Sequence, residues 1–551
     1  MPDPEYVIKH TTLDCSLRGK SSATSVQFRN LKYASIPARY QDSIPNDALG
    51  AGIDGVFDAT HCGPSCPQKR GALAFDLTLV GNVTLPHELG QGASEEMDEF
   101  DCLHVNVTVP KSALNAETDK AKDLPVFVWV HGGGLSYGSN AFPQYDLQRF
   151  VERSSEVGKP VIGVAMNYRV GLFGFMANED LGAPGNMGFK DQVLAFRWIK
   201  KHIAGFGGNP NNVTAAGESA GGISLSTILC ANVGAEALFE RVVIMSGEAT
   251  LRKPRHKRWH RQMCRSQSTF LEIKETELKT LETSLLATEA EQLAQKLPLA
   301  QHYCGYVDGK WLKEDVTLSV LANGHRTLHK PAWCEEYVVG DTAHDGTVLK
   351  ARILDQPDAL SRLKAACSRY LTASETNTLL AAYNLDGQPS PERQQDMLRA
   401  LASELRFYYP TLAVHNGWKS TSPPKQAARY HVHVPNPFDG AYKGLASHEL
   451  DVAFLLQNFN DQLDEQNRRI AESFADRFIG FAHGYGWCKS GKVVVVGSEG
   501  VVEVDESSYD RVYRDGRGAV LESLGADKVW AIAEMWQGVP SEDEEKVVAK
   551  M

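Results

Sequence analysis

The pentapeptide at 217–221 reads Gly-Glu-Ser-Ala-Gly and sets Ser219 between two glycines. A short strand-like run, 212–216, comes before it, and an apolar run compatible with a helix, 223–229, comes after it. A serine on a sharp turn from a strand into a helix exposes its hydroxyl, and small neighbours let the backbone crowd around it. The pattern therefore predicts that Ser219 is a nucleophile.

A serine hydroxyl is a weak nucleophile near neutral pH. It needs an adjacent base, a group that orients the base, and donors for the developing oxyanion. The segment 131–134 reads His-Gly-Gly-Gly and follows an apolar run that ends at Val130. Because glycine has no Cβ, its N–H group can face a substrate carbonyl without obstruction. We expect the N–H groups of Gly133, Gly134 and Ala220 to form the oxyanion hole.

The elements that must position these groups alternate between strands and helices. Four continuous apolar runs are typical of buried parallel strands, at 123–130, 161–166, 241–245 and 336–339. Helical segments such as 190–206 lie between them, and the chain before about residue 109 is rich in strands and turns. The alternation predicts an α/β fold with helices on both faces of a mostly parallel sheet, and functional residues at the carboxyl ends of its strands.

Two long stretches, 251–329 and 349–425, are helical and polar with few strand signals. No flexible boundary flanks them, so we interpret both as insertions in a single domain that spans 1–551. The last residues, about 541–551, are acidic and are typical of a frayed tail. The final Ala-Lys-Met, 549–551, is a weak alternative signal for a peroxisomal address.

The composition is that of a globular protein, with 42% hydrophobic and 23% charged residues and a net charge of −11. An acidic balance without a basic tail argues against binding to nucleic acid or to an anionic membrane surface. The first residues lack the apolar core of a secretory signal, and no apolar run is long enough to span a bilayer. We therefore expect a cytoplasmic protein without stable membrane association.

Further motifs follow one another in order along most of the chain. They lie at 28–37, 63–68 (Gly-Pro-Ser-Cys-Pro-Gln), 101–107 (Asp-Cys-Leu-His-Val-Asn-Val), 167–171, 185–192 and 206–210. With the two glycine-rich segments, they make the chain resemble the type B carboxylesterases, which include cholinesterases and fungal lipases. The resemblance implies an α/β-hydrolase fold and a serine hydrolase that cleaves small-molecule carboxylic esters through an acyl-enzyme, without a cofactor.

The resemblance also points to the acid. The family's Gly-Thr-Asn-x-Asp-Glu-Gly looks like the segment 340–346, which reads Gly-Asp-Thr-Ala-His-Asp-Gly. It implies that Asp345 is the acid of the triad, where the family more often has glutamate. Asp341 is the rival, and we interpret it as a cap or turn former because it directly follows the predicted strand.

The family's base lies in a His-Gly-x-Glu/Asp-x-x-Phe motif, which the segment 448–454 resembles. This implies that His448 is the base, although Glu449 stands in place of the glycine. His431 and His433 are rival histidines. Their His-Val-His alternation indicates one face of a strand, and without a third ligand a metal site there is not expected.

By resemblance, Cys66 and Cys102 would form a disulfide. The lack of a secretory signal argues for reduced thiols instead, because cytosolic cysteines usually stay reduced. Two further positions have an expected role. Leu135 replaces the aromatic residue that usually follows the three glycines, which would reshape the acyl pocket. Ser246, after the strand at 241–245, is interpreted as a structural hydroxyl.

The basic run 252–261 is interpreted as a solvated helix face, with a site that attracts an anionic substrate as the alternative. Three competing functions stay open beside the esterase. One is a non-catalytic binding relative, which the presence of Ser219 and its partners disfavours. Another is a lipase with an apolar lid at 71–91, and the third is a biosynthetic enzyme that uses the same site for acyl transfer or elimination. The motifs define neither the ester nor the oligomeric state.

Overall fold

A computed structural model gives the structure of the whole chain apart from a few short segments. It describes all residues except 1–4, 51, 53, 86–94, 115–122, 275, 326–328, 388 and 540–551. The predicted tail at 541–551 and part of the predicted lid at 71–91 therefore lie outside the described residues.

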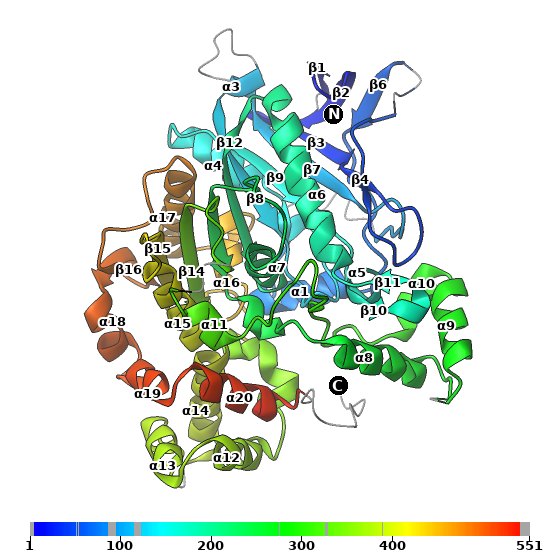
Figure 1. Cartoon of the computed structure of the whole chain (residues 1–551). Helices are drawn as coiled ribbons and strands as arrows, with labels where there is room; N and C mark the ends of the chain where they lie inside the picture. The colour runs from blue at the N-terminus through cyan, green and yellow to red at the C-terminus, as the bar shows by residue number, and fades with distance from the viewer. Residues whose placement is uncertain are drawn as a thin grey trace.

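The centre of the molecule is one twisted sheet, in the strand order β1-β2-β3-β7-β9-β8-β12-β13-β14-β15-β16-β17, with β6 beside β2 (Figure 1). From β9 to β16 the neighbours run parallel, whereas the strands at both ends pair antiparallel. The four predicted apolar runs are confirmed as β8, β9, β13 and β14. The strands are β1 (Glu5–His10), β2 (Cys15–Ser21), β3 (Ser25–Lys32), β6 (Val56–Ala59), β7 (His104–Pro110), β8 (Leu124–Val130), β9 (Ile162–Met166), β12 (Gly208–Glu218), β13 (Arg241–Met245), β14 (Glu336–Thr342), β15 (Gln426–Val432), β16 (Lys492–Gly497) and β17 (Gly500–Asp505).

Helices cover both faces of this sheet. They are α1 (Ala72–Val80), α3 (Lys111–Leu114), α4 (Gln148–Glu156), α5 (Gly171–Phe175), α6 (Met187–His202), α7 (Ala220–Leu229), α8 (Lys257–Phe270), α9 (Leu278–Ala287), α10 (Ala290–Lys296), α11 (Leu318–Ala322), α12 (Ala359–Tyr370), α13 (Ala373–Ala382), α14 (Pro391–Ser403), α15 (Tyr409–Lys419), α16 (Leu450–Leu456), α17 (Glu465–Ala482), α18 (Glu506–Tyr513), α19 (Arg517–Leu524) and α20 (Ala526–Gln537). Short strands form two small ribbons, β4 (Ala34–Ser35) with β5 (Ile44–Pro45), and β10 (Ala177–Asn178) with β11 (Ala183–Pro184).

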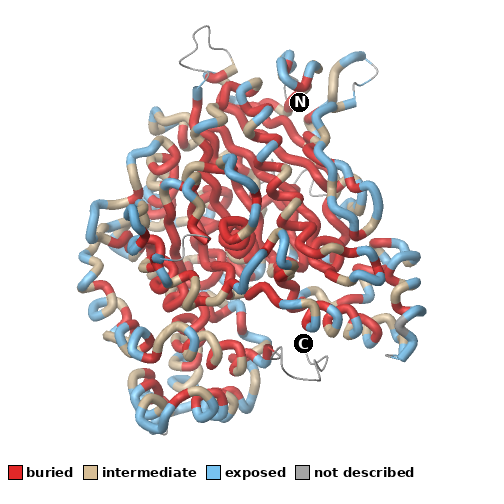
Figure 2. Tube along the Cα trace, viewed as in Figure 1, coloured by how far each residue is buried: buried red, intermediate tan, exposed pale blue. Residues whose placement is uncertain are grey.

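Strand β8 shows how the sheet divides the core. Its side chains alternate between the two faces, as in any strand. Val126, Val128 and Val130 pack into the core beneath α6 and α7, whereas Phe127 and Trp129 pack against α4, α16 and α17. All seven residues of β8 are buried, which explains why its sequence is continuously apolar rather than alternating. The buried central strands stand out in Figure 2.

The two predicted insertions are helical, as expected. Helices α8 to α11 belong to the stretch 251–329, and α12 to α15 belong to 349–425. Helix α15, however, packs directly against β14 and β15, so the end of the second stretch is part of the layer that covers the sheet. In the described part of the chain, no helix combines the length and the apolar character that crossing a membrane requires.

Candidate active site

Ser219 forms the turn between β12 and α7. Its backbone has φ 52° and ψ −117°, a region that residues with a side chain rarely adopt. Hydrogen bonds hold the turn on both sides, because the Ser219 N–H donates to Met245 O (2.9 Å) and its carbonyl accepts from Ile223 N (2.8 Å). Ser219 is half-buried, whereas both neighbours, Glu218 and Ala220, are fully buried. The turn therefore exposes one hydroxyl above an otherwise closed core.

Close packing explains the glycines around this turn. A Cβ on Gly221 would lie 2.0 Å from the carbonyl oxygen of Val130, and a Cβ on Gly247 would lie 2.3 Å from that of Ser219. Any side chain at either position would displace the backbone beside the serine. The glycine pattern in the sequence thus reflects the contact of α7 with the ends of β8 and β13.

The glycine loop after β8 lies beside the serine. Gly133 and Gly134 have φ of 99° and 60°, which favour glycine, and a Cβ on Gly132 would lie 3.4 Å from Cβ of Ser219. Within the described segments, no hydrogen bond uses the N–H groups of Gly133, Gly134 or Ala220. Three donors beside the serine are thus unengaged, and Ala220 also lies at the positive end of α7, as an oxyanion hole requires.

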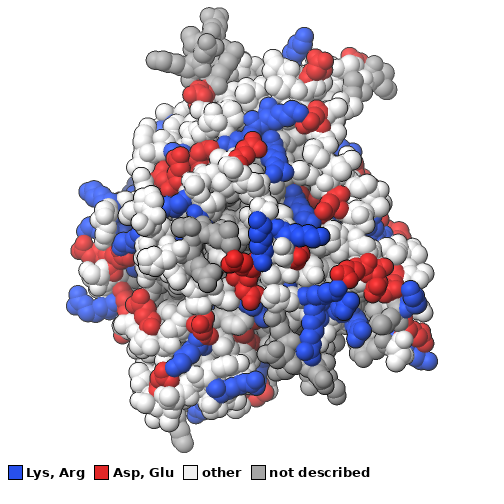
Figure 3. Space-filling model, in the orientation of Figure 1, with Lys and Arg blue, Asp and Glu red and all other residues white. Residues whose placement is uncertain are grey.

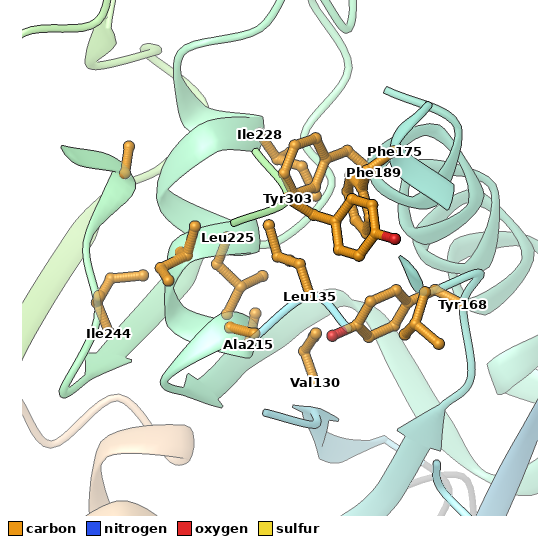
Figure 4. Packing of buried hydrophobic residues seen from close by; sticks show 14 of the residues in the cluster. Val130, Leu135, Tyr168, Phe175, Phe189, Ala215, Leu225, Ile228, Ile244 and Tyr303 are labelled. Carbon is orange, nitrogen blue, oxygen red and sulfur yellow. The ribbon is translucent and has the colours of Figure 1, made fainter. Parts of the chain in front are cut away.

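The residue after the glycines lies in the core. Leu135 is fully buried, and Figure 4 shows it among Leu225, Tyr168 and Tyr303. Its side chain therefore packs between α7 and the segment that carries Tyr303. Side chains from several elements thus surround Leu135, which is smaller than the aromatic residue usual at this position.

Asp345 and His448 meet at the carboxyl end of the sheet. Nδ1 of His448, just before α16, lies 2.6 Å from Oδ1 of Asp345, which follows β14. The other carboxylate oxygen of Asp345 accepts from Ser246 Oγ (3.0 Å) and from Thr342 N (2.8 Å). All four residues are buried. Ser246 thus orients the carboxylate, which is the structural role predicted for its hydroxyl.

The interpretation of Asp341 as a cap or turn former is wrong. Strand β14 continues to Thr342, so Asp341 lies inside the strand and is fully buried. A buried carboxylate needs partners, and Asp341 has two, the His431 ring and Arg514 Nη2 (3.1 Å). Burial nevertheless raises the pKa of Asp341 to about 6. Asp341 therefore belongs to a separate ionic cluster and does not contact His448.

The two rival histidines lie on one face of the sheet, as predicted. The ring of His431 stacks on Tyr509 with the ring centres 4.1 Å apart, and His433 Nε2 lies 2.8 Å from the Tyr509 hydroxyl. Across the described ranges, no three His, Cys, Asp or Glu side chains are arranged to hold a metal ion.

The other ring nitrogen of His448 faces Glu218. Nε2 lies 2.9 Å from Oε1 of this residue, which directly precedes Ser219. Within the described residues, no hydrogen bond joins His448 to Ser219. Burial alone would lower the pKa of His448, but the charge of Glu218 and the hydrogen bond to Asp345 outweigh it and raise the pKa well above its usual value. The imidazole therefore lies between two carboxylates, an arrangement that favours its protonated form.

A second pair of acids lies behind the histidine. The Tyr145 hydroxyl lies 2.7 Å from Oδ2 of Asp76, on α1, and 3.1 Å from Oε1 of Glu449. Both carboxyl groups are buried, and burial raises the pKa of each. Glu449 also adopts φ 68°, a conformation that favours glycine. The motif comparison detected Glu449 as a departure, but no sequence signal marked Asp76 or Tyr145, because they lie hundreds of residues from their partner.

The cysteines paired by resemblance are also neighbours. Cys66 and Cys102 are buried free thiols. A hydrogen bond from Cys66, together with burial, raises the pKa of Cys102 well above its usual value. The disulfide between them stays a prediction.

Comparison with known proteins places this geometry in a family. A family model described as the carboxylesterase family matches residues 8–485. The chain belongs to this family. A solved structure of a thermophilic PNB esterase has a TM-score of 0.67 and 22% identity, and the match covers 94% of this chain and 100% of that one. This likeness confirms the α/β-hydrolase fold.

Curated relatives of this carboxylesterase include lipases and esterases. Lipase 3 of Yarrowia lipolytica is 28% identical over 467 residues, which cover 83% of this chain and 84% of the relative. Lipase 2 of Diutina rugosa is 30% identical over 67% of this chain and 68% of its own length. The para-nitrobenzyl esterase of Bacillus subtilis is 33% identical over 43% of each chain. The predicted activity is thereby confirmed: the protein is a serine hydrolase of carboxylic esters.

Replacing Glu449 with glutamine tests the buried acids. A carboxyl group whose pKa is raised by folding holds its proton more tightly in the folded protein, so stability falls as the pH rises above the unfolded pKa of about 4.3. Glutamine still accepts a hydrogen bond from Tyr145 but does not ionise. We expect the melting temperature of Glu449→Gln, relative to wild type, to increase steadily from pH 5 to pH 8 in thermal denaturation.

The matched control is Glu465→Gln, at the exposed start of α17. Its melting temperature should differ from wild type by the same small amount at each pH. A difference for Glu449→Gln that stays constant or shrinks with pH would show that Glu449 is ionised without penalty.

Proposed function

We propose that Ser219, His448 and Asp345 form the catalytic triad of this carboxylesterase. The observation that carries the proposal is the 2.6 Å contact between the buried side chains of His448 and Asp345, at the same end of the sheet as the turn that carries Ser219. The carboxylate fixes the tautomer in which Nδ1 carries hydrogen and Nε2 is free to take a proton. Asp345 thereby does the work that glutamate does in many family members.

In the proposed mechanism, His448 Nε2 takes the proton of Ser219 Oγ as this oxygen attacks the ester carbonyl. The N–H groups of Gly133, Gly134 and Ala220 stabilise the negative oxygen of the tetrahedral intermediate. The imidazolium then gives its proton to the leaving alcohol. Water enters, and His448 removes a proton from it as its oxygen attacks the acyl carbonyl. The imidazolium then returns the proton to Ser219 Oγ as the acid leaves.

The contact of His448 with Glu218 sets a condition on this mechanism. The imidazole must lose its extra proton, and its Nε2 must turn from Glu218 toward Ser219, before it can act as a base. Catalytic hydrogen bonds are often long or absent before substrate binds, so the observed contact is compatible with the proposed role. Glu218 would then stabilise the imidazolium that forms again in the transition state.

Substitution of the two candidate acids distinguishes their roles. We expect Ser219→Ala and Asp345→Asn to lower kcat for p-nitrophenyl butyrate by roughly 10³ to 10⁴-fold, because the nucleophile or the correct tautomer is lost. Asp341→Asn should instead lower the melting temperature, because it removes the buried negative charge beside Arg514 and His431. A kcat loss that is larger for Asp341→Asn than for Asp345→Asn would move the acid to Asp341.

The pH profile tests the role of Glu218. Activity should rise with pH as His448 loses its proton, and the negative charge of Glu218 helps to hold that proton. Removing the charge lowers the histidine pKa, so Glu218→Gln should shift the midpoint of the kcat/KM profile to lower pH. Glu240→Gln, a substitution remote from the serine, is the control and should leave the midpoint in place. An unchanged midpoint in Glu218→Gln would contradict the ionic contact.

A lipase is the second candidate, and one observation favours it. Helix α1 lies within the predicted lid and exposes Phe75, whose ring stands edge-on to Tyr137 with the centres 6.0 Å apart. Tyr137 belongs to the loop that follows the three glycines. The exposed ring of Phe75 thus contacts the loop that carries the proposed oxyanion hole. Contact with a long acyl chain would require an apolar side chain in such a place. Two of the relatives named above are lipases.

A series of p-nitrophenyl esters from acetate to palmitate separates the two candidates. A lipase should show kcat/KM rising to chains of about twelve carbons or more, and Phe75→Ser should reduce that rise because exposed apolar contact is lost. A maximum at short chains, unaffected by Phe75→Ser, would exclude the lipase. Phe100→Ser is the matched control, because Phe100 is similarly exposed elsewhere on the surface.

A further inference from the structure

The basic run 252–261 has two parts with different surroundings. Arg258, on α8, is exposed, and Lys257 and Arg261 face Glu179 at the surface. The interpretation as a solvated helix face holds for this outer part. It is wrong for the beginning of the run, where Lys253 and Arg255 are buried and Arg252 is half-buried. On the visible surface, basic side chains lie among acidic ones (Figure 3).

Four arginines lie close together in this region: Arg252, Arg255, Arg352 and Arg406. One carboxylate pairs with two of them. Glu534, on α20, binds Arg406 Nη1 through Oε1 (2.7 Å) and Arg255 Nη2 through Oε2. Both oxygens of Glu534 are therefore engaged. The nearby carboxylate of Glu248 accepts instead from the backbone and hydroxyl of Thr250.

Among the described residues, no acidic side chain forms an ion pair with Arg252. It ends a 3-10 turn at Ala249–Arg252, and its Nη1 atom is fully buried with no hydrogen-bond partner in the described structure. A Cβ on Gly134 would lie 3.5 Å from its Nη2 atom. The guanidinium thus reaches the glycine proposed to bind the oxyanion. Burial, with the charges of Arg352 and Arg406, lowers the pKa of Arg252 to about 9.

Arg352 is the second arginine without an acidic partner among the described residues. Its charge contributes to the lowered pKa of Arg252, and it lines a cavity of about 480 Å³. His302 lines the same cavity, and both of its ring nitrogens are buried without a partner. Burial and the neighbouring arginines lower the pKa of His302 well below its usual value, which favours the neutral ring. The one acid at this cavity, Asp358, is exposed and faces Arg362.

A guanidinium with a buried nitrogen and no counterion is unfavourable, because the desolvation of that nitrogen is not offset by an ion pair. A carboxylate bound there would offset it, and the planar guanidinium suits two-point binding of that group. We propose that Arg252 and Arg352 form an anion subsite next to the oxyanion hole, and that the preferred esters carry a free carboxylate on their acyl or alcohol part. This proposal rests on the proposed function of Ser219.

Paired esters test the subsite on the full chain. One pair differs in the acyl part, p-nitrophenyl hemiglutarate and the neutral p-nitrophenyl valerate. The other differs in the alcohol part, 4-carboxyphenyl butyrate and phenyl butyrate. We expect the ratio of kcat/KM, charged over neutral, to fall about tenfold or more in Arg252→Gln for at least one pair, which identifies the side that carries the anion. Arg252→Lys should keep part of the ratio, and the exposed control Arg258→Gln should keep all of it.

Different outcomes would overturn the anion subsite and the proposed catalytic triad. Failure of wild type to hydrolyse any of the four esters would overturn the proposed function. Hydrolysis with the same ratios in wild type and Arg252→Gln would overturn the anion subsite alone. If Arg252→Gln has a lower melting temperature and its kcat/KM falls equally for charged and neutral esters, Arg252 has a structural role. That result would also overturn the anion subsite. Arg352→Gln gives a second variant, expected to lower the same ratio, should Arg252→Gln fold poorly.

Discussion

Four neighbouring parallel strands are paired in register near their carboxyl ends, and the site depends on that alignment. Val130 of β8 lies opposite Gly217 of β12, and the next residue, Glu218, lies opposite Met245 of β13. Met245 in turn lies opposite Gly340 of β14. Beyond these positions the chain supplies the glycine loop after β8, the turn at Ser219 after β12, Ser246 after β13, and the proposed acid, Asp345, after β14. Because backbone hydrogen bonds fix the register, a slip of one residue would turn each of these groups to the wrong side.

The surroundings of His448 combine burial with an excess of negative charge. Asp345 and Glu218 contact its two ring nitrogens, and Asp76 and Glu449 lie beyond them around a shared tyrosine hydroxyl. Burial raises the pKa of Glu218, Asp76 and Glu449, which disfavours ionisation of all three at once. The same arrangement stabilises positive charge on the imidazole. The protonation state of each residue at this site therefore depends on the charges of the other residues around His448.

Sequence patterns were sufficient to predict those features of the fold and the site that depend on a few consecutive residues. The turn at Ser219, the glycine loop and the buried strands are of this kind, because local backbone geometry and strand burial leave a direct imprint on residue type. Asp345 was found only through the resemblance. The surroundings of Asp341, the contact of Glu218 with the histidine, and the inward position of Arg252 could not be predicted. Each depends on which distant segments the fold brings together, and residue type alone does not record that.

Glu449 has a consequence for how this site varies among relatives. Its backbone already has the conformation that glycine adopts most readily, and glycine is the residue typical of the family motif. A glutamate codon becomes a glycine codon through one nucleotide substitution, and the backbone would not have to move. The electrostatic surroundings of the histidine can therefore change in a single evolutionary step, while the fold and the strand register that position it stay the same.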